Sequence, residues 1–198
     1  MCLEMNKPKK LIIFDLDNTL RFSNREDGLI FCQMDIDKDH RYYLDTWTEL
    51  SRLMQQNVAV GVATNQCAVY DYWCSINSPE AAHRQTRFYL DSYFESMLHD
   101  GDLFDYAFAI ARGSIVAKPN PGMLIWLAGR FQVYPEEIIM VGDSWKDCLA
   151  ARSFGCEFIK VGDFGYTQNG TTPMPENIPA PDLWFDSAYS AVLHLLER

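Results

Sequence analysis

The sequence predicts an α/β fold, a three-layer sandwich in which a mostly parallel, doubly wound sheet lies between helices. Two observations support this. Short apolar runs alternate along the chain with longer amphipathic stretches, as in strand–helix–strand units. The apolar runs also lack polar alternation, which is typical of strands buried on both faces. The 198 residues contain no linker or repeat, so we expect one domain over residues 1–198.

The apolar runs give the order of the predicted strands. They are expected at Lys10–Asp15, Val58–Ala63, Tyr106–Ala111, Ile138–Val141 and Glu157–Val161. After the first run, Leu20–Asp39 shows no sustained helical period. It is predicted to form an irregular turn and a short hairpin, with Gly28 near the bend.

Amphipathic spacing and capping residues predict the helices. They are expected at Tyr43–Gln56, from Pro79 to about His99 with Ser78 as cap, and at Pro121–Phe131, Trp145–Phe154 and Asp186–Glu197. Gly155 is expected to end the fourth of these. The stretch Gly162–Pro181, rich in Gly, Pro, Asn and Thr, is predicted to be a long surface loop.

Composition excludes several classes of protein. The net charge of -10 disfavours binding to nucleic acid or to an anionic membrane surface. No apolar run is long enough to cross a bilayer. The six cysteines form no C-x-x-C pair, and the polar, basic start does not resemble a signal peptide. We therefore expect a cytoplasmic protein with reduced thiols.

Polar strings follow the predicted strands, where the carboxyl ends of a parallel sheet form ligand sites. Asp15 and Asp17, two residues apart, would share one face of a regular strand. Their repulsion could be relieved by Mg²⁺ or by protonation of Asp17, which could then act as a general acid. The alternative is a pair of surface or capping acids.

Three further side chains could bind phosphate. Thr64 and Asn65 follow the second strand, where a hydroxyl and backbone N–H groups could donate to phosphate oxygens; turn formation is the alternative. Lys118 precedes Pro119 and a predicted helix, which would restrict its direction. Its cation would offset phosphate charge, unless it is an ordinary surface lysine.

The string Gly142–Asp147 follows the fourth predicted strand. Asp143 would face a metal there, and Gly142 would allow close approach of the backbone. Asp147 would share a helix face with Asp143 if the helix covered both. Helix capping by Asp143 or Ser144 is compatible with these roles.

Together, the strings Asp15–Thr19, Thr64–Gln66, Lys118-Pro119 and Gly142–Asp147 resemble the haloacid dehalogenase superfamily of phosphotransferases, over essentially the whole chain. The resemblance implies magnesium held by Asp15, Asp143 and the backbone carbonyl of Asp17. It also implies that Asp15 is the nucleophile that forms an aspartyl-phosphate.

The same resemblance implies roles for the remaining motif residues. Asp17 would be the general acid and then the base. Thr64 and Lys118 would bind the phosphoryl group, assisted by Asn65 and Asn18. Asp147 would support the metal's waters or Lys118.

The subfamily is indicated by Thr64–Gln66 and by Lys118–Met123, which look like the histidinol-phosphate and heptose-bisphosphate phosphatases. That branch often carries a zinc loop before the lysine, whereas Ile110–Ala117 offers no ligand. The intervals between motifs leave no room for more than a minimal cap. The candidate rim residues of the resulting open site are Arg21, Arg112, Tyr70, Tyr72 and Trp73.

Three functions remain open from the sequence. The first is a magnesium-dependent phosphomonoester hydrolase that acts on a small phosphorylated metabolite. The alternatives are a 3′-phosphatase on nucleic-acid ends, against which the charge counts, and a catalytically silent binding module on the same fold. Substrate and oligomeric state do not follow from the sequence.

Overall fold

The main sheet of the computed structural model, which describes residues 10–23, 40–42, 44–162 and 173–198, is parallel throughout. Its strand order is β5-β4-β1-β6-β7-β8. The strands are β1 (Lys10–Phe14), β4 (Val58–Asn65), β5 (Phe104–Ala109), β6 (Ile138–Gly142), β7 (Glu157–Val161) and β8 (Leu183–Phe185). The predicted α/β fold class is therefore confirmed.

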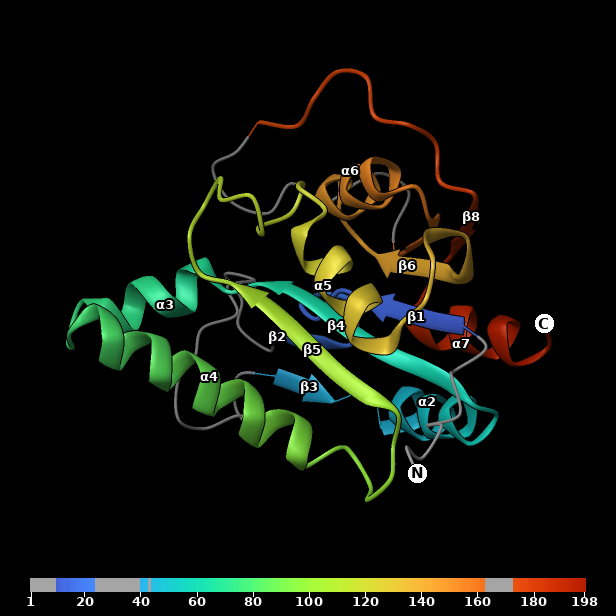
Figure 1. Cartoon of the computed structure of the whole chain (residues 1–198), viewed down its shortest axis with the longest axis horizontal. Helices are drawn as coiled ribbons and strands as arrows, with labels where there is room; N and C mark the ends of the chain where they lie inside the picture. The colour runs from blue at the N-terminus through green and yellow to red at the C-terminus, as the bar shows by residue number, and fades with distance from the viewer. Residues whose placement is uncertain (1–9, 24–39, 43, 163–172) are drawn as a thin grey trace, which may run out of the picture.

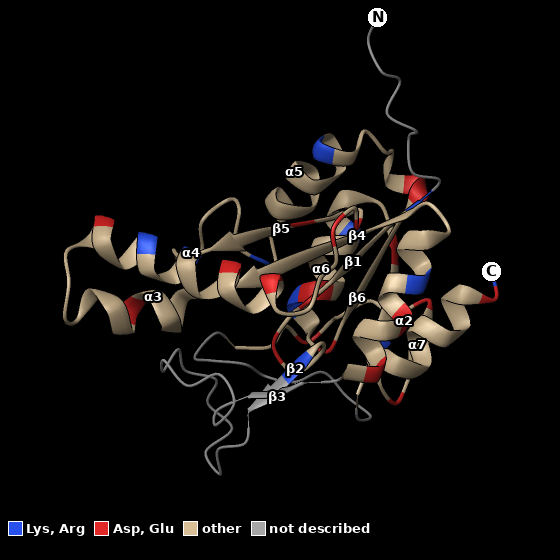
Figure 2. Cartoon of the chain, turned by 90° about the horizontal axis from the view of Figure 1, so that it is seen from below, with Lys and Arg blue, Asp and Glu red and all other residues tan. Residues whose placement is uncertain are grey.

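Helices cover both faces of this sheet (Figures 1 and 2). They are α2 (Leu44–Gln55), α3 (Cys67–Cys74), α4 (Pro79–Glu95), α5 (Gly122–Phe131), α6 (Trp145–Phe154) and α7 (Ala188–Leu196). α5 and α6 pack on one face, and α2, α4 and α7 contribute to the core on the other. None of the helices in the described ranges has both the length and the apolar character needed to cross a membrane.

Strand β1 shows how the sequence divides the core into two layers. Ile12 and Phe14 point into the cluster under α2, α4 and α7, whereas Leu11 and Ile13 join the cluster under α5 and α6. All four side chains are buried. Each such burial stabilises the fold by about 1.5–3 kcal/mol relative to exposure. β1 is thus held from both sides.

Several elements differ from the predictions. β5 begins at Phe104 and ends at Ala109, two residues earlier than expected at each end, and α4 ends at Glu95 instead of near His99. Ser78 caps α4 as predicted, because its hydroxyl accepts from the backbone N–H of Ala81.

Short or irregular elements were missed. α3 has no side-chain cap, the 3₁₀ turn at Pro135–Glu137 is one turn long, and β8 has three residues, too few for a periodic pattern. The last helix starts at Ala188, capped by the Ser187 hydroxyl, not at Asp186.

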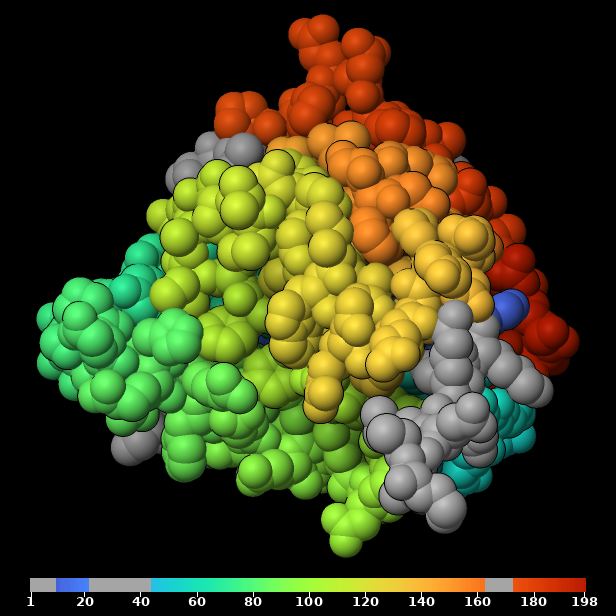
Figure 3. All heavy atoms as spheres, in the orientation of Figure 1, coloured from blue at the N-terminus to red at the C-terminus, as the bar shows by residue number. Residues whose placement is uncertain are grey.

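A hairpin is present as predicted, with β2 (Arg21–Ser23) paired antiparallel with β3 (His40–Tyr42), but the second strand lies just beyond the predicted range Leu20–Asp39. The bend that was predicted near Gly28 lies outside the described residues. Of the predicted loop Gly162–Pro181, residues 173–181 contain no helix or strand. They run over the surface beside the face covered by α5 and α6 (Figure 3).

The register of β1 sets the place of the motifs. Phe14 lies opposite Val62 of β4 and Val141 of β6. Because all three strands are parallel, the residues that follow them emerge at one edge of the sheet. β1 is also the point from which the chain builds outward in both directions, where open α/β sheets bind ligands.

Candidate active site

An acidic triad lies at this edge of the sheet. Asp15 follows β1, Asp143 follows β6, and Asp147 lies in the first turn of α6. All three are buried, and one carboxylate oxygen from each lies within 4.8 Å of the others. Since buried like charges repel strongly, the triad suits a cation.

Lys118 supplies part of the balancing charge. Its Nζ lies 2.5 Å from Asp15 Oδ1 and 2.6 Å from Asp147 Oδ1. Three carboxylates and one ammonium, all ionised, leave a net charge of about −2 in a buried space. A divalent cation would neutralise that excess.

The ionisation of these groups reflects their burial. Burial raises the pKa of the Asp15 carboxyl well above its ordinary value, and Asp147 and Asp143 raise it further, against the opposing effect of Lys118. Burial alone would lower the pKa of Lys118, but Asp147 and Asp15 raise it above its ordinary value. The lysine therefore remains a cation.

Local structure aims Asp147 at the triad. Its Oδ2 accepts from the backbone N–H of Ser144 at 3.0 Å and from the Ser144 hydroxyl at 2.6 Å. The condition for a helix face shared with Asp143 is not met, because α6 begins only at Trp145. The two acids meet because the first-turn carboxylate points back toward the strand end.

Gly142 is needed for this arrangement. A Cβ atom at this position would lie 2.6 Å from Cγ of Asp147, which is closer than atoms approach without displacement. Gly142 was predicted to allow close approach of the backbone to another group, and in the structure that group is the carboxylate of Asp147.

Asp17 is turned toward other partners. Its Oδ1 accepts from Arg21 Nε at 2.6 Å and its Oδ2 accepts from Gln66 Nε2 at 2.7 Å. Its carboxylate is not part of the triad, so its predicted role as a metal ligand rests on its backbone carbonyl.

The residues after β4 organise the rest of the site. Gln66 Nε2 also donates to Thr64 Oγ1 at 2.7 Å, which leaves the proton of that hydroxyl for another acceptor. The Asn65 amide donates to the carbonyl oxygen of Lys118 at 2.9 Å and accepts from its N–H at 3.0 Å. The Asn65 side chain is therefore used to fix the backbone that carries Lys118.

The structure places the candidate rim residues in different environments. Arg21 is fully buried, so its prediction as a rim residue was wrong. Arg112 is exposed and pairs with Asp71 of α3 at 3.0 Å. Tyr70, Tyr72 and Trp73 also lie on α3, and their contact with substrate stays a prediction.

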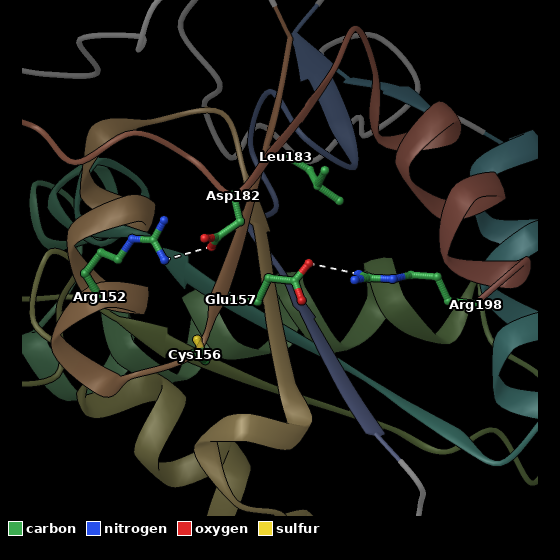
Figure 4. A pocket seen from close by; sticks show the side chains of 6 residues that line it. All are labelled: Arg152, Cys156, Glu157, Asp182, Leu183 and Arg198. Atoms are coloured by element: carbon green, nitrogen blue, oxygen red, sulfur yellow. Dashed lines mark hydrogen bonds and ion pairs between the residues drawn. The ribbon is translucent and has the colours of Figure 1, made fainter.

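A surface pocket lies at the opposite edge of the sheet, near the start of β7 (Figure 4). Within it, Arg152 pairs with Asp182 at 2.7 Å and Arg198 pairs with Glu157 at 2.8 Å. Its cations are already matched by acids, so we assign the chemistry to the triad.

Sequence comparison connects this chain with haloacid dehalogenase-like proteins. Residues 115–188 match the HAD-hydrolase-like family model. A phosphoglycolate phosphatase of Pasteurella multocida is 39% identical over 80 residues, which cover 40% of this chain and 33% of that protein. A phosphoglycolate phosphatase of Mannheimia succiniciproducens is 42% identical over 69 residues, covering 35% and 29% respectively. The chain thus matches about a third of the length of these relatives.

Structural comparison extends the likeness to nearly the whole chain. The D,D-heptose 1,7-bisphosphate phosphatase of B. bronchiseptica, solved with magnesium and phosphate, superposes with a TM-score of 0.64 at 21% identity. The superposition covers 95% of this chain and 98% of that one. The fold of this chain is thus an α/β fold like that of this bisphosphatase. The resemblance to the haloacid dehalogenase superfamily is confirmed in sequence over residues 115–188, and the fold is shared with the bisphosphatase over almost the whole chain.

Most of the sequence-predicted site residues are brought to one region of the structure. Asp15, Asp143, Asp147 and Lys118 converge directly, and Thr64 is linked to Asp17 through Gln66. No role was predicted for Gln66 from the sequence, and Arg21 was predicted to lie on the rim, whereas both side chains bind the carboxylate of Asp17. The signal for Gln66 was its place in the string Thr64–Gln66, whereas the burial of Arg21 depends on helix α4.

Proposed function

We propose that this protein is a magnesium-dependent phosphomonoester hydrolase that works through an aspartyl-phosphate on Asp15. The observation that carries the proposal is the buried triad of Asp15, Asp143 and Asp147 with Lys118 bound to two of its members. Phosphoryl transfer is catalysed mainly by positioning and by neutralising charge, which such a cluster can supply.

The residues present fit magnesium. Mg²⁺ prefers oxygen ligands, keeps some of its waters and is bound through one or two carboxylates plus substrate phosphate. Asp15, Asp143 and the backbone carbonyl of Asp17 would hold it, with Asp147 supporting its waters or Lys118. When bound, the metal neutralises phosphoryl charge and orients the phosphate for in-line attack. The structural neighbour from B. bronchiseptica is a complex with magnesium and phosphate.

The first half-reaction forms the covalent intermediate. A carboxylate oxygen of Asp15 attacks phosphorus, and the bond from phosphorus to the ester oxygen breaks. The leaving oxygen takes its proton from Asp17, so an alcohol departs. Lys118 and the hydroxyl of Thr64, whose proton is not used in its bond with Gln66, donate to the phosphoryl oxygens.

The second half-reaction releases phosphate. Asp17, now a carboxylate, removes a proton from a water that attacks phosphorus of the aspartyl-phosphate. The bond from phosphorus to the Asp15 oxygen breaks, inorganic phosphate leaves, and both aspartates return to their starting states. Asn65 serves throughout by holding the backbone of Lys118.

A small phosphorylated metabolite is the proposed substrate. The named relatives are phosphoglycolate and heptose-bisphosphate phosphatases, both of which act on small phosphoesters. The charge of -10 counts against a nucleic-acid substrate. Among the described residues, Cys67, Cys74 and Cys156 are free thiols, which supports the cytoplasm as the site of action.

Release of phosphate from p-nitrophenyl phosphate tests the proposal. Activity should require Mg²⁺, disappear with a chelator and be lost in Asp15→Asn. Asp182→Asn, at the opposite edge of the sheet, is the matched control and should keep its activity. Undiminished hydrolysis by Asp15→Asn would remove the assigned nucleophile. A panel of sugar phosphates and phosphorylated oligonucleotides separates the substrate classes, and magnesium binding without hydrolysis of any of them would favour a silent module.

A further inference from the structure

The carboxylate of Asp17 is held at both oxygens by residues from separate parts of the chain. Arg21 Nε donates to Oδ1 at 2.6 Å, and Gln66 Nε2 donates to Oδ2 at 2.7 Å. With both oxygens engaged, the carboxylate can neither rotate freely nor turn into the triad without breaking these bonds. The orientation of Asp17 is therefore fixed by its neighbours.

Arg21 is itself fixed from the opposite side. Its side chain is fully buried, and its Nη1 donates to the hydroxyl of Tyr89 at 2.6 Å. The guanidinium carbon lies 5.1 Å from the ring centroid of Tyr89 and 5.2 Å from that of Tyr93, both on α4. Cation–π contacts and a hydrogen bond thus hold the guanidinium against this helix.

A buried arginine requires a compensating charge. Burial alone would lower the pKa of Arg21, but the adjacent Asp17 carboxylate raises it above its ordinary value, so the guanidinium stays charged. Among the described residues, Asp17 is the carboxylate that pairs with it. A position that needs only packing would not be expected to use a fully buried cation.

The turn after β1 places Arg21 beside Asp17. The backbone N–H groups of Leu20 and Arg21 donate to the carbonyl oxygen of Leu16 at 2.9 and 3.0 Å. Asn18 adopts a left-handed conformation, with φ of 64°, and its N–H donates to the carbonyl oxygen of Arg21 at 2.8 Å. The chain therefore folds back within one turn, so that residues four apart can form the ion pair.

We propose that Arg21 is a positioning residue for acid–base catalysis: anchored on α4, it fixes the Asp17 carboxylate outside the metal-binding triad, where it can serve the leaving group. This inference rests on the proposed function, in which Asp17 is the catalytic acid. It adds that α4, which is far from the string Asp15–Thr19 in sequence, takes part in orienting that acid.

Leaving-group dependence tests this role, because a general acid matters most when the leaving oxygen is a poor one. We would compare kcat/KM for p-nitrophenyl phosphate and for phenyl phosphate, whose leaving group is much more basic. In Arg21→Met, phenyl phosphate hydrolysis should fall about 10-fold more than p-nitrophenyl phosphate hydrolysis. Asp17→Asn should show the same discrimination, more strongly.

Leu90→Ala is the matched control, since this buried α4 residue contributes to the core but its side chain has no group that could bind Asp17 or Arg21 through a hydrogen bond. It should lower activity toward both esters by the same factor. If Arg21→Met does not fold, Arg21→Lys keeps the cation but loses the planar fork, and it should show a smaller discrimination in the same direction.

The outcomes separate the two hypotheses. A wild-type protein that hydrolyses neither ester, with or without Mg²⁺, overturns the proposed function and the role of Arg21 together. An active wild type with equal losses for both esters in the Arg21 variants overturns only the positioning role. An active wild type whose Asp17→Asn variant lacks the discrimination overturns the assignment of Asp17 as the acid.

Discussion

Replacing Asp143 by asparagine should stabilise the protein in the absence of metal. The variant removes one of three buried carboxylates that converge within 4.8 Å, while it nearly conserves side-chain volume. In the metal-free state these charges repel, and the cation of Lys118 opposes part of the repulsion. An acidic residue that serves to bind a cation should therefore lower the free energy of unfolding when the cation is removed.

The magnitude follows from the geometry. At an effective dielectric constant of about 20, two like charges 4.8 Å apart, the largest separation within the triad, repel by about 3.5 kcal/mol. Asp143 has two such neighbours, and we take the cation of Lys118, which pairs with both of them, to offset about one of the two repulsions. Because burial raises the pKa of Asp15, protonation relieves part of the remainder. We expect a gain of about 1–3 kcal/mol, or roughly 2–10 °C in Tm.

Thermal unfolding with and without Mg²⁺ measures both parts of this prediction. Wild-type protein should gain about 2.7 kcal/mol at a magnesium concentration of about 100 times Kd. Asp143→Asn should start at a higher Tm in chelator and gain little from Mg²⁺. Glu157→Gln, which removes one charge at the opposite edge, should keep the magnesium-dependent shift. A lower Tm for metal-free Asp143→Asn, together with an intact magnesium shift, would refute the reasoning.

Other substitutions give independent checks. Asp17→Ala leaves a fully buried guanidinium unpaired and should lower the free energy of unfolding by about 3 kcal/mol in urea titrations; a loss below about 1 kcal/mol would show that the ion pair contributes little. Gly142→Ala forces the Asp147 carboxylate to move, so phosphatase activity should fall about 10-fold or more; unchanged activity would mean that its position is not needed. Burial raises the pKa of Cys156 to about 12, so iodoacetamide should label Cys74 well before Cys156 in peptide maps of folded protein, and the reverse order would contradict the described burial.

The sheet was predictable because its strands are long enough to show a pattern. All five predicted apolar runs matched strands to within two residues, since apolar runs without alternation are typical of central parallel strands. The three-residue strand β8 and the uncapped helix α3 carry too little local signal. Their structure depends on contacts with the rest of the chain.

The triad was predictable in part, because residues that follow parallel strands meet at one edge. Asp15 and Asp143 could be placed in this way, as could Lys118 from its place before α5. The partners of the Asp17 carboxylate could not be predicted from the sequence. Arg21 was predicted to lie on the rim, but tyrosines of α4 bury it. These tyrosines are distant in sequence, and no local pattern encodes their contact with Arg21.

Trapping of the covalent intermediate tests the central claim most directly. Acid-quenched protein taken during turnover would be treated with borohydride, which reduces an aspartyl-phosphate to homoserine, and then mapped by tandem mass spectrometry. We predict homoserine at position 15 only, and only when both substrate and Mg²⁺ are present. Continued phosphate release with Asp15 unmodified, or with the label on another residue, would contradict the account.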